Sequence, residues 1–303
     1  MLTTAWVSVV VLAIVQGVAE FLPISSSGHL VILGKLLESV SGSGFSESDS
    51  LRLNVALHFG TLLSILVVCR RHLRLALSRP LLLAAIVVAT IPAAVIGLMF
   101  KDDLEAAFST PLLAGCCLLV TAFFLAAGQK FSSNVRPLEQ LRLRDGWVVG
   151  FFQAIALLPG VSRSGSTIAG GLLSGMTREA AAAFSFLIAL PAIGGATLLT
   201  AVDSWKGSSS RMEQSQHEAS RKIDTTEAGG NSDSVMRPNP SSTASLTPAM
   251  IALGAGLSFL VGIVSLKVLL ALISRRKLHW FAWYCLLAGC LTILWQLWPA
   301  STT

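Results

Sequence analysis

Six long apolar runs constrain this 303-residue chain more than any other feature of its sequence. Each run is close to the ~20 residues that a helix needs to cross a hydrocarbon core about 30 Å thick. Lipid cannot satisfy backbone polar groups, so spanning segments must be helices or closed barrels, and no alternating strand pattern is present. The sequence therefore predicts an all-α polytopic membrane protein with six transmembrane helices. The runs are Leu53–Cys69, Leu81–Phe100, Pro111–Ala127, Ala180–Ala201, 249–273 and 280–298.

The basic residues indicate how these spans are oriented. The formal net charge of +6 does not require a nucleic-acid partner, because membrane proteins use Lys and Arg as topology signals. Twelve Lys and Arg lie in the loops of one side and seven in those of the other, five of the seven within residues 203–248. The richer side should be cytoplasmic, which places both termini on the extracytoplasmic side.

A further apolar segment, residues 5–37, is interrupted by polar groups between Gln16 and His29. Its helix should break at Pro23 and resume near His29, which predicts a re-entrant helix–loop–helix pair. Irregular backbone is tolerated at membrane depth only where protein buries it or a cavity adjoins it. Because ionisable groups are costly there, they usually mark a site. The polar residues of this stretch include Glu20 and three consecutive serines, Ser25, Ser26 and Ser27, followed by Gly28.

Residues 147–174 form a second interrupted stretch, broken at Leu158–Gly165, with a helix expected to start near Thr167. The two stretches align without gaps at an offset of 137, with eight identities in 26 positions. With three spans after each, they predict an inverted-topology repeat within one membrane domain, 5–127 and 147–298. Residues 203–248 are too polar to bury a core and should form a disordered loop. The identities pair Val11, Gln16, Ala19, Ser25, Ser27, Gly28, Gly34 and Leu36 with Val148, Gln153, Ala156, Ser162, Ser164, Gly165, Gly171 and Leu173.

The two copies differ where chemistry would occur. The second copy has Arg163 at the position of Ser26, and the first alone has Glu20 and His29. A guanidinium binds phosphate oxygens in a fork, and glycine and a helix start let backbone N–H groups approach an anion. This favours a phosphate cradle over an Arg that snorkels to the interface or only pairs with Glu20. The expected phosphate-binding residues are Ser25, Ser27, Gly28, Gly160, Ser162, Arg163, Ser164 and Thr167.

The remaining polar groups allow several roles. Glu20 could hold a divalent cation with Gln16 as a neutral ligand, or act as a base. His29 could be an acid–base group or a nucleophile, and Ser26 a nucleophile. His58 and Asn54 in the first span are compatible with either packing or site lining.

The motif residues resemble the bacterial undecaprenyl-diphosphate phosphatase family, also known for bacitracin resistance. The resemblance covers nearly the whole chain except about 203–248. It implies a membrane enzyme of the bacterial inner membrane that removes the terminal phosphate of undecaprenyl diphosphate and so recycles the lipid carrier of peptidoglycan and cell-wall synthesis. It also implies Mg²⁺ or Ca²⁺ and a catalytic set of Glu20, Ser26, His29 and Arg163. The motifs span 16–29, 57–61, 159–167 and 183–191.

Two features depart from the family pattern, and a second function stays open. Gln16 occupies a position where the family also permits Glu, which leaves Glu20 as the main metal ligand. The 203–248 insertion lies outside the pattern. Inverted repeats with broken helices are also typical of transporters, so a flippase of polyprenyl phosphate lipids is the alternative. The sequence leaves homo-oligomer formation open.

Overall fold

The computed structural model describes residues 2–26, 29, 45–107, 110–133, 135–200, 202 and 246–297. Helices dominate these ranges, and the β contact found in them is an isolated bridge between Arg136 and Met176. The predicted all-α class is therefore confirmed for the described chain. The helices are α1 (Leu2–Ala19), α3 (Glu47–Val68), α4 (Arg70–Ser78), α5 (Pro80–Met99), α6 (Lys101–Ala107), α7 (Pro111–Lys130), the 3₁₀ turn η1 (Leu138–Gln140), α8 (Leu143–Ile155), α9 (Arg163–Leu173), Arg178–Thr200, α11 (Pro248–Ser274) and α12 (Leu278–Leu297).

Six helices of the described residues are long and apolar enough to cross a membrane, and they coincide with the six predicted runs. They are α3, α5, α7, the Arg178–Thr200 helix, α11 and α12. The first begins at Glu47 rather than Leu53, because the Ser46 side chain caps it by accepting a hydrogen bond from the N–H of Asp49 at 3.1 Å. The chain is thus a multi-pass membrane protein.

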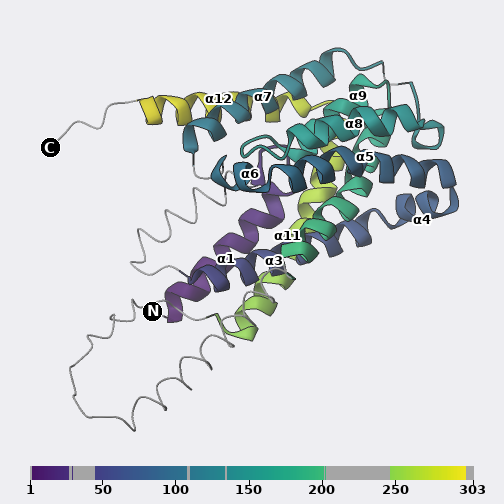
Figure 1. The fold of residues 1–303 in the computed structure, drawn as a ribbon. Helices are drawn as coiled ribbons and strands as arrows, with labels where there is room; N and C mark the ends of the chain where they lie inside the picture. The colour runs from purple at the N-terminus through teal and green to yellow at the C-terminus, as the bar shows by residue number, and fades with distance from the viewer. Residues whose placement is uncertain are drawn as a thin grey trace, which may run out of the picture.

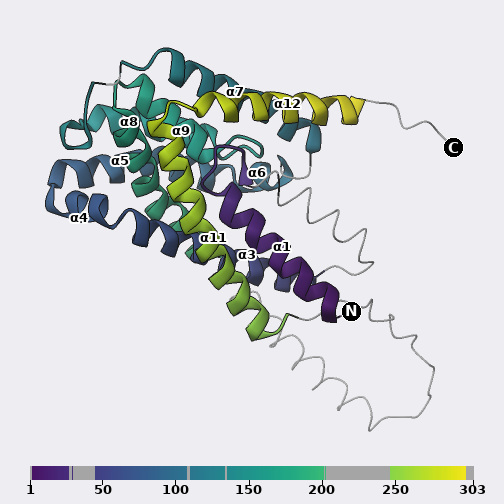
Figure 2. The ribbon, with the colours of Figure 1, turned by 180° about the vertical axis from the view of Figure 1, so that it is seen from behind.

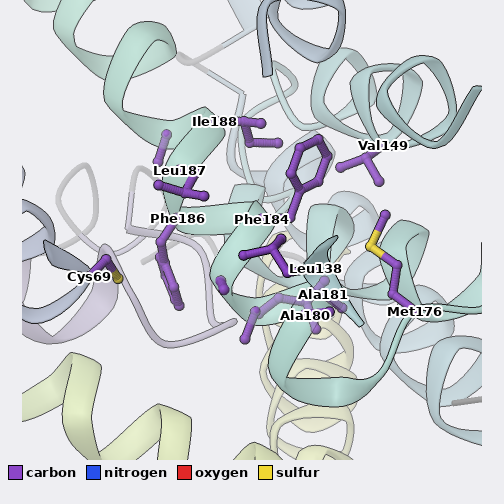
Figure 3. Close-up of a cluster of buried hydrophobic side chains, with 14 of the residues drawn as sticks. Cys69, Leu138, Val149, Met176, Ala180, Ala181, Phe184, Phe186, Leu187 and Ile188 are labelled. Carbon is purple, nitrogen blue, oxygen red and sulfur yellow. The ribbon is translucent and has the colours of Figure 1, made fainter. Parts of the chain in front are cut away.

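The Arg178–Thr200 helix lies at the centre of the molecule. Half of the most apolar stretch of this helix is buried inside the protein, whereas only 17% of the corresponding stretch of α12, at the edge, is buried. Its side chains form the main hydrophobic cluster, where Phe184, Phe186 and Ile188 are fully buried (Figure 3). This rigid centre supports the second interrupted stretch, because Ile168 and Leu172 of α9 belong to the same cluster.

The interrupted stretches pack against spans that lie far away in the sequence. Helix α1 lies along α11 and α8 lies along α5, while α7 and α12 run side by side (Figures 1 and 2). Gly146 and Gly150 allow the α5–α8 contact, since a Cβ at either position would come within 2.8 Å of a backbone oxygen of α5. This is the small-residue packing that brings membrane helices close together.

The exchange of contacts is reciprocal between the two predicted halves. The first interrupted stretch packs on a span of the second half, and the second stretch on a span of the first half. Interleaved repeats would produce this arrangement, although the inverted orientation of the halves stays a prediction.

Two boundaries differ from the sequence prediction. Helix α1 ends at Ala19 rather than near residue 22, and α9 begins at Arg163 rather than near Thr167. The second shift arises because Ser162 acts as the N-cap and accepts a hydrogen bond from the N–H of Gly165 at 3.2 Å. Arg163 therefore occupies the first turn of a helix instead of a loop.

Some predictions fall outside the described residues. Ser27, Gly28, the helix expected after the first break and residues 203–245 of the predicted disordered loop belong to this group. Residues 246–248, at the end of that range, lie within the described chain. Leu246 is buried and its N–H donates to Asp49 Oδ2 at 3.2 Å, and Thr247 caps α11.

Candidate active site

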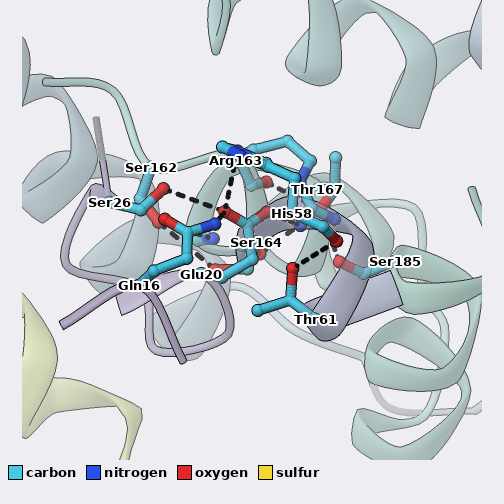
Figure 4. A network of polar contacts seen from close by, with 11 residues as sticks. Gln16, Glu20, Ser26, His58, Thr61, Ser162, Arg163, Ser164, Thr167 and Ser185 are labelled. Atoms are coloured by element: carbon cyan, nitrogen blue, oxygen red, sulfur yellow. Dashed lines mark hydrogen bonds and ion pairs between the residues drawn. The ribbon is translucent and has the colours of Figure 1, made fainter. Parts of the chain in front are cut away.

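Glu20 lies at the centre of a polar network directly after α1 (Figure 4). Its side chain is only 6% exposed, so its charge needs partners inside the protein. Oε1 accepts a hydrogen bond from Nη2 of Arg163 at 2.7 Å. Oε2 accepts from Nε2 of Gln16 and from Oγ of Ser26, both at 3.1 Å. The first interrupted stretch thus supplies three members of the network and the second supplies the cation.

Arg163 reaches Glu20 from the first turn of α9. Its side chain is 16% exposed, and among the described residues its buried Nη1 has no hydrogen-bond partner. Buried donors are nearly always satisfied, so an unpaired guanidinium N–H beside a carboxylate indicates a place where an acceptor binds. A phosphate oxygen is such an acceptor, and guanidinium groups bind phosphate in pairs of hydrogen bonds.

The loop before Arg163 is held in place by Thr121 of α7. Its Oγ1 accepts from the N–H of Ser162 at 2.9 Å and lies 3.3 Å from the carbonyl oxygen of Gly160, to which it can donate. Gly160 has a φ of +94°, and a Cβ there would come within 2.3 Å of the carbonyl oxygen of Ala114. Glycine is therefore needed at this position for conformation and for space. Thr121 was not predicted from the sequence, since a lone Thr in an apolar span is common.

The other predicted phosphate ligands of the second stretch are fully buried hydroxyls near Arg163. Oγ of Ser162 and Oγ of Ser164 lie 3.3 Å apart. The Thr167 hydroxyl lies 2.8 Å from the carbonyl oxygen of Arg163 and 2.6 Å from the hydroxyl of Ser185. Thr167 is thus engaged with its own helix and with the central Arg178–Thr200 helix, so it fixes the position of α9. Ser185 was not foreseen, because only the packing of these two helices brings it near the site.

His58 joins the site from α3. Its Nε2 lies 3.8 Å from Oε2 of Glu20, and its Nδ1 donates to the carbonyl oxygen of Asn54 at 2.9 Å. The backbone contact of Nδ1 leaves Nε2 directed toward the carboxylate. The sequence left open whether His58 packs or lines a site, and the structure places it at the site.

His29 makes its side-chain hydrogen bonds with residues other than Glu20 and Arg163. Its Nδ1 donates to the carbonyl oxygen of Ser25 at 2.7 Å, and its Nε2 lies 2.6 Å from the hydroxyl of Tyr284 on α12. The two rings also stack. Ser25 itself turns the chain with a φ of 69°. The structure therefore joins Glu20, Ser26 and Arg163 directly, whereas His29 contacts a residue that the sequence did not single out, the chain's single tyrosine.

The donor set near Glu20 fits a hard divalent cation in part. Oε1 of Gln16 is buried and, within the described chain, has no hydrogen-bond partner, so a neutral oxygen ligand is available one helical turn from the carboxylate. No cluster of three or more His, Cys, Asp or Glu side chains that could hold a metal occurs in the described ranges. Mg²⁺ commonly uses one or two carboxylates and completes its shell with water and substrate phosphates. Glu20 and Gln16 suit that mode of binding.

Fold and site together define a class: a multi-pass helical membrane protein whose buried carboxylate and guanidinium come from two interrupted stretches. The chain belongs to the family described as bacitracin resistance protein BacA, whose model matches residues 9–291. A protein from Rhodopirellula baltica named undecaprenyl-diphosphatase is 41% identical over 95% of this chain and 97% of its own length. Proteins of the same name from Syntrophotalea carbinolica and Alkaliphilus metalliredigens are 37% and 34% identical, over 92% and 95% of this chain and 95% and 98% of their own lengths. The family expected from the motifs is confirmed.

Proposed function

We propose that this protein hydrolyses undecaprenyl diphosphate to undecaprenyl phosphate and inorganic phosphate. The observation that carries the proposal is the buried pair of Glu20 and Arg163, in which Nη1 of Arg163 has no hydrogen-bond partner in the described structure. The names of the relatives, all undecaprenyl-diphosphatases, support the same reaction.

In the proposed reaction, the terminal phosphate competes with Glu20 for Arg163. The unpaired Nη1 makes the first contact, and Nη2 then exchanges the carboxylate for a phosphate oxygen. A guanidinium and its neighbouring backbone N–H groups stabilise the charge that develops on the phosphate, which is the main contribution of the protein to phosphoryl transfer. The exchange also releases Glu20 to accept a proton.

Ser26 is the proposed nucleophile, since its hydroxyl already donates to Glu20 at 3.1 Å. Its Oγ bonds to the terminal phosphorus while Glu20 takes the hydroxyl proton. The bond from that phosphorus to the bridging oxygen breaks, and undecaprenyl phosphate leaves. Water then attacks the phosphorus of the phosphoserine, the bond from phosphorus to Oγ breaks, and Glu20 returns its proton to Oγ, which restores the hydroxyl and releases inorganic phosphate. His29 acting on water directly is the route that this proposal replaces, because its ring is engaged with Ser25 and Tyr284.

A divalent cation, Mg²⁺ or Ca²⁺, fits this proposal. Oε1 of Glu20, once Arg163 has left it, and the unpaired Oε1 of Gln16 would hold it, while Oε2 of Glu20 remains the acceptor of the Ser26 proton. When bound, the cation supplies positive charge that neutralises the phosphate oxygens.

The proposed location is the bacterial cytoplasmic membrane, with both termini on its extracytoplasmic side. There the reaction would recycle the lipid carrier for peptidoglycan and other cell-wall polymers and would confer bacitracin resistance. The partners are then the bilayer and the polyprenyl diphosphate itself.

Phosphate release by the purified protein in detergent tests the proposal against a flippase of the same lipids. A pure transporter breaks no bond of the diphosphate, so it releases no inorganic phosphate in detergent, where no transmembrane gradient exists. We expect release from undecaprenyl diphosphate with Mg²⁺ and its loss with a chelator. Tight lipid binding by folded protein without any release would replace the phosphatase with a flippase.

A further inference from the structure

A cavity of about 270 Å³ lies between α7 and α12, beside the candidate active site. The helices make room for it with small side chains, Ala114 on α7 and Ala288 on α12, next to the close backbone approach of Gly115 and Gly289. The remaining lining residues are His29, Leu118, Gly160, Tyr284, Leu291 and Thr292.

The lining of the cavity includes residues close in sequence to the site and an exposed residue of α12. Gly160, in the loop that precedes Arg163, and His29, which follows the serines of the first stretch, both line it. Leu291 of α12, which is 65% exposed, lines it as well. A molecule with one end at Arg163 could therefore extend through this space and leave into the bilayer.

The polar groups that line the cavity already have partners. The Thr292 hydroxyl donates to the carbonyl oxygen of Ala288 in its own helix at 2.8 Å. Both ring nitrogens of His29 are engaged, one of them by the Tyr284 hydroxyl. A polar ligand would find few free hydrogen-bonding groups here, whereas hydrocarbon would fill the space and gain dispersion contacts that an empty cavity forgoes.

We infer that this cavity binds the first isoprenoid units of the polyprenyl chain, and that the rest of the chain leaves between α7 and α12 into the lipid. The inference rests on the proposed function, because it takes the diphosphate to lie at Arg163. The proposed occupant of the cavity is the tail of the substrate itself, which is the part of the lipid joined directly to the phosphates. An ordinary acyl chain from the bilayer is the competing occupant.

A photoreactive polyprenyl monophosphate tests the inference, with a diazirine in its first isoprenoid units. We expect labelling of cavity-lining residues of α7 and α12, displaced by unlabelled polyprenyl phosphate and not by phosphatidylglycerol. Ala288→Phe fills the cavity and should abolish this labelling and raise KM for undecaprenyl diphosphate at least tenfold. Leu287→Phe adds the same ring on the neighbouring position, where the side chain is 62% exposed, and should change neither.

The possible outcomes distinguish binding of the tail in the cavity from hydrolysis of the diphosphate. If wild type releases phosphate but the label lies elsewhere, or phosphatidylglycerol displaces it, the inference fails and the function stands. If wild type labels the cavity but releases no phosphate, the function fails and the binding site stands. If Ala288→Phe does not fold, the smaller substitution Ala288→Leu replaces it in this test. Unchanged labelling and an unchanged KM in a folded variant would overturn the inference.

Discussion

Arg163 and Glu20, which are 143 positions apart in the chain, are joined by a hydrogen-bonded ion pair of 2.7 Å. Neither stretch contains the pair alone, since the first copy has Ser26 where the second has Arg163. The pair therefore assembles only when both interrupted stretches have folded around the central helix. Such a site couples the fold to the chemistry, because loss of either partner leaves a buried charge without compensation.

Glu20→Gln should cost both stability and activity. The amide keeps the shape of the carboxylate but leaves the Arg163 charge buried without its counter-ion, which costs about 3–5 kcal/mol when a buried pair is broken. It also removes the proposed acceptor of the Ser26 proton. Thermal unfolding in detergent and phosphate release measure the two effects. The exposed Glu139→Gln is the control and should resemble wild type. Normal turnover by Glu20→Gln would exclude this carboxylate from the reaction.

Gln16→Glu should strengthen metal binding. The new carboxylate would lie one turn from Glu20, so the two negative charges repel each other until a cation lies between them. We expect a lower melting temperature than wild type in chelator and a larger rise with added Mg²⁺, since a ligand that binds the native state stabilises it. The Mg²⁺ concentration that gives half-maximal phosphate release should fall about tenfold, which corresponds to ~1.4 kcal/mol. An unchanged Mg²⁺ response would exclude Gln16 from the metal site.

Thr121→Val should loosen the loop that precedes Arg163. Valine has the shape of threonine but cannot accept the hydrogen bond from the Ser162 N–H, and a buried unsatisfied donor costs about 1–3 kcal/mol. We expect kcat to fall more than KM rises, because the loop still forms but the guanidinium is less precisely held. Thr90→Val removes a hydroxyl that bonds only within its own helix in the described contacts and serves as the matched control. Equal effects of the two variants would contradict the positioning role of Thr121.

The proposed orientation predicts opposite labelling of two exposed positions. In a protein whose native cysteines are replaced by alanine, Asp103→Cys on α6 should react with a membrane-impermeant maleimide in intact cells. Arg71→Cys on α4, also exposed, should react only after the cells are opened. The physical reason is the excess of Lys and Arg on the α4 side of the membrane. The reverse pattern would invert the proposed topology.

Length and hydropathy sufficed to predict the six spans, because the bilayer imposes one requirement on every span. That Glu20 and Arg163 both belong to a site was predicted, since ionisable groups in interrupted apolar stretches usually mark one, whereas a direct ion pair between them was the alternative to a phosphate cradle. The start of α9 was misplaced, because the cap formed by Ser162 and Gly165 was not weighed. Thr121, Ser185 and Tyr284 were not foreseen, since their roles depend on which helices pack together.

The central claim is that Arg163 binds the terminal phosphate, and phosphate release by Arg163→Ala tests it most directly. Loss of one donor to a developing phosphate charge costs roughly 100- to 1,000-fold in rate. We predict a fall of at least that size in folded Arg163→Ala, with Arg163→Lys in between because it keeps the charge but not the fork. The exposed Arg144→Ala should match wild type. Near-normal release by folded Arg163→Ala would contradict the assignment of this site.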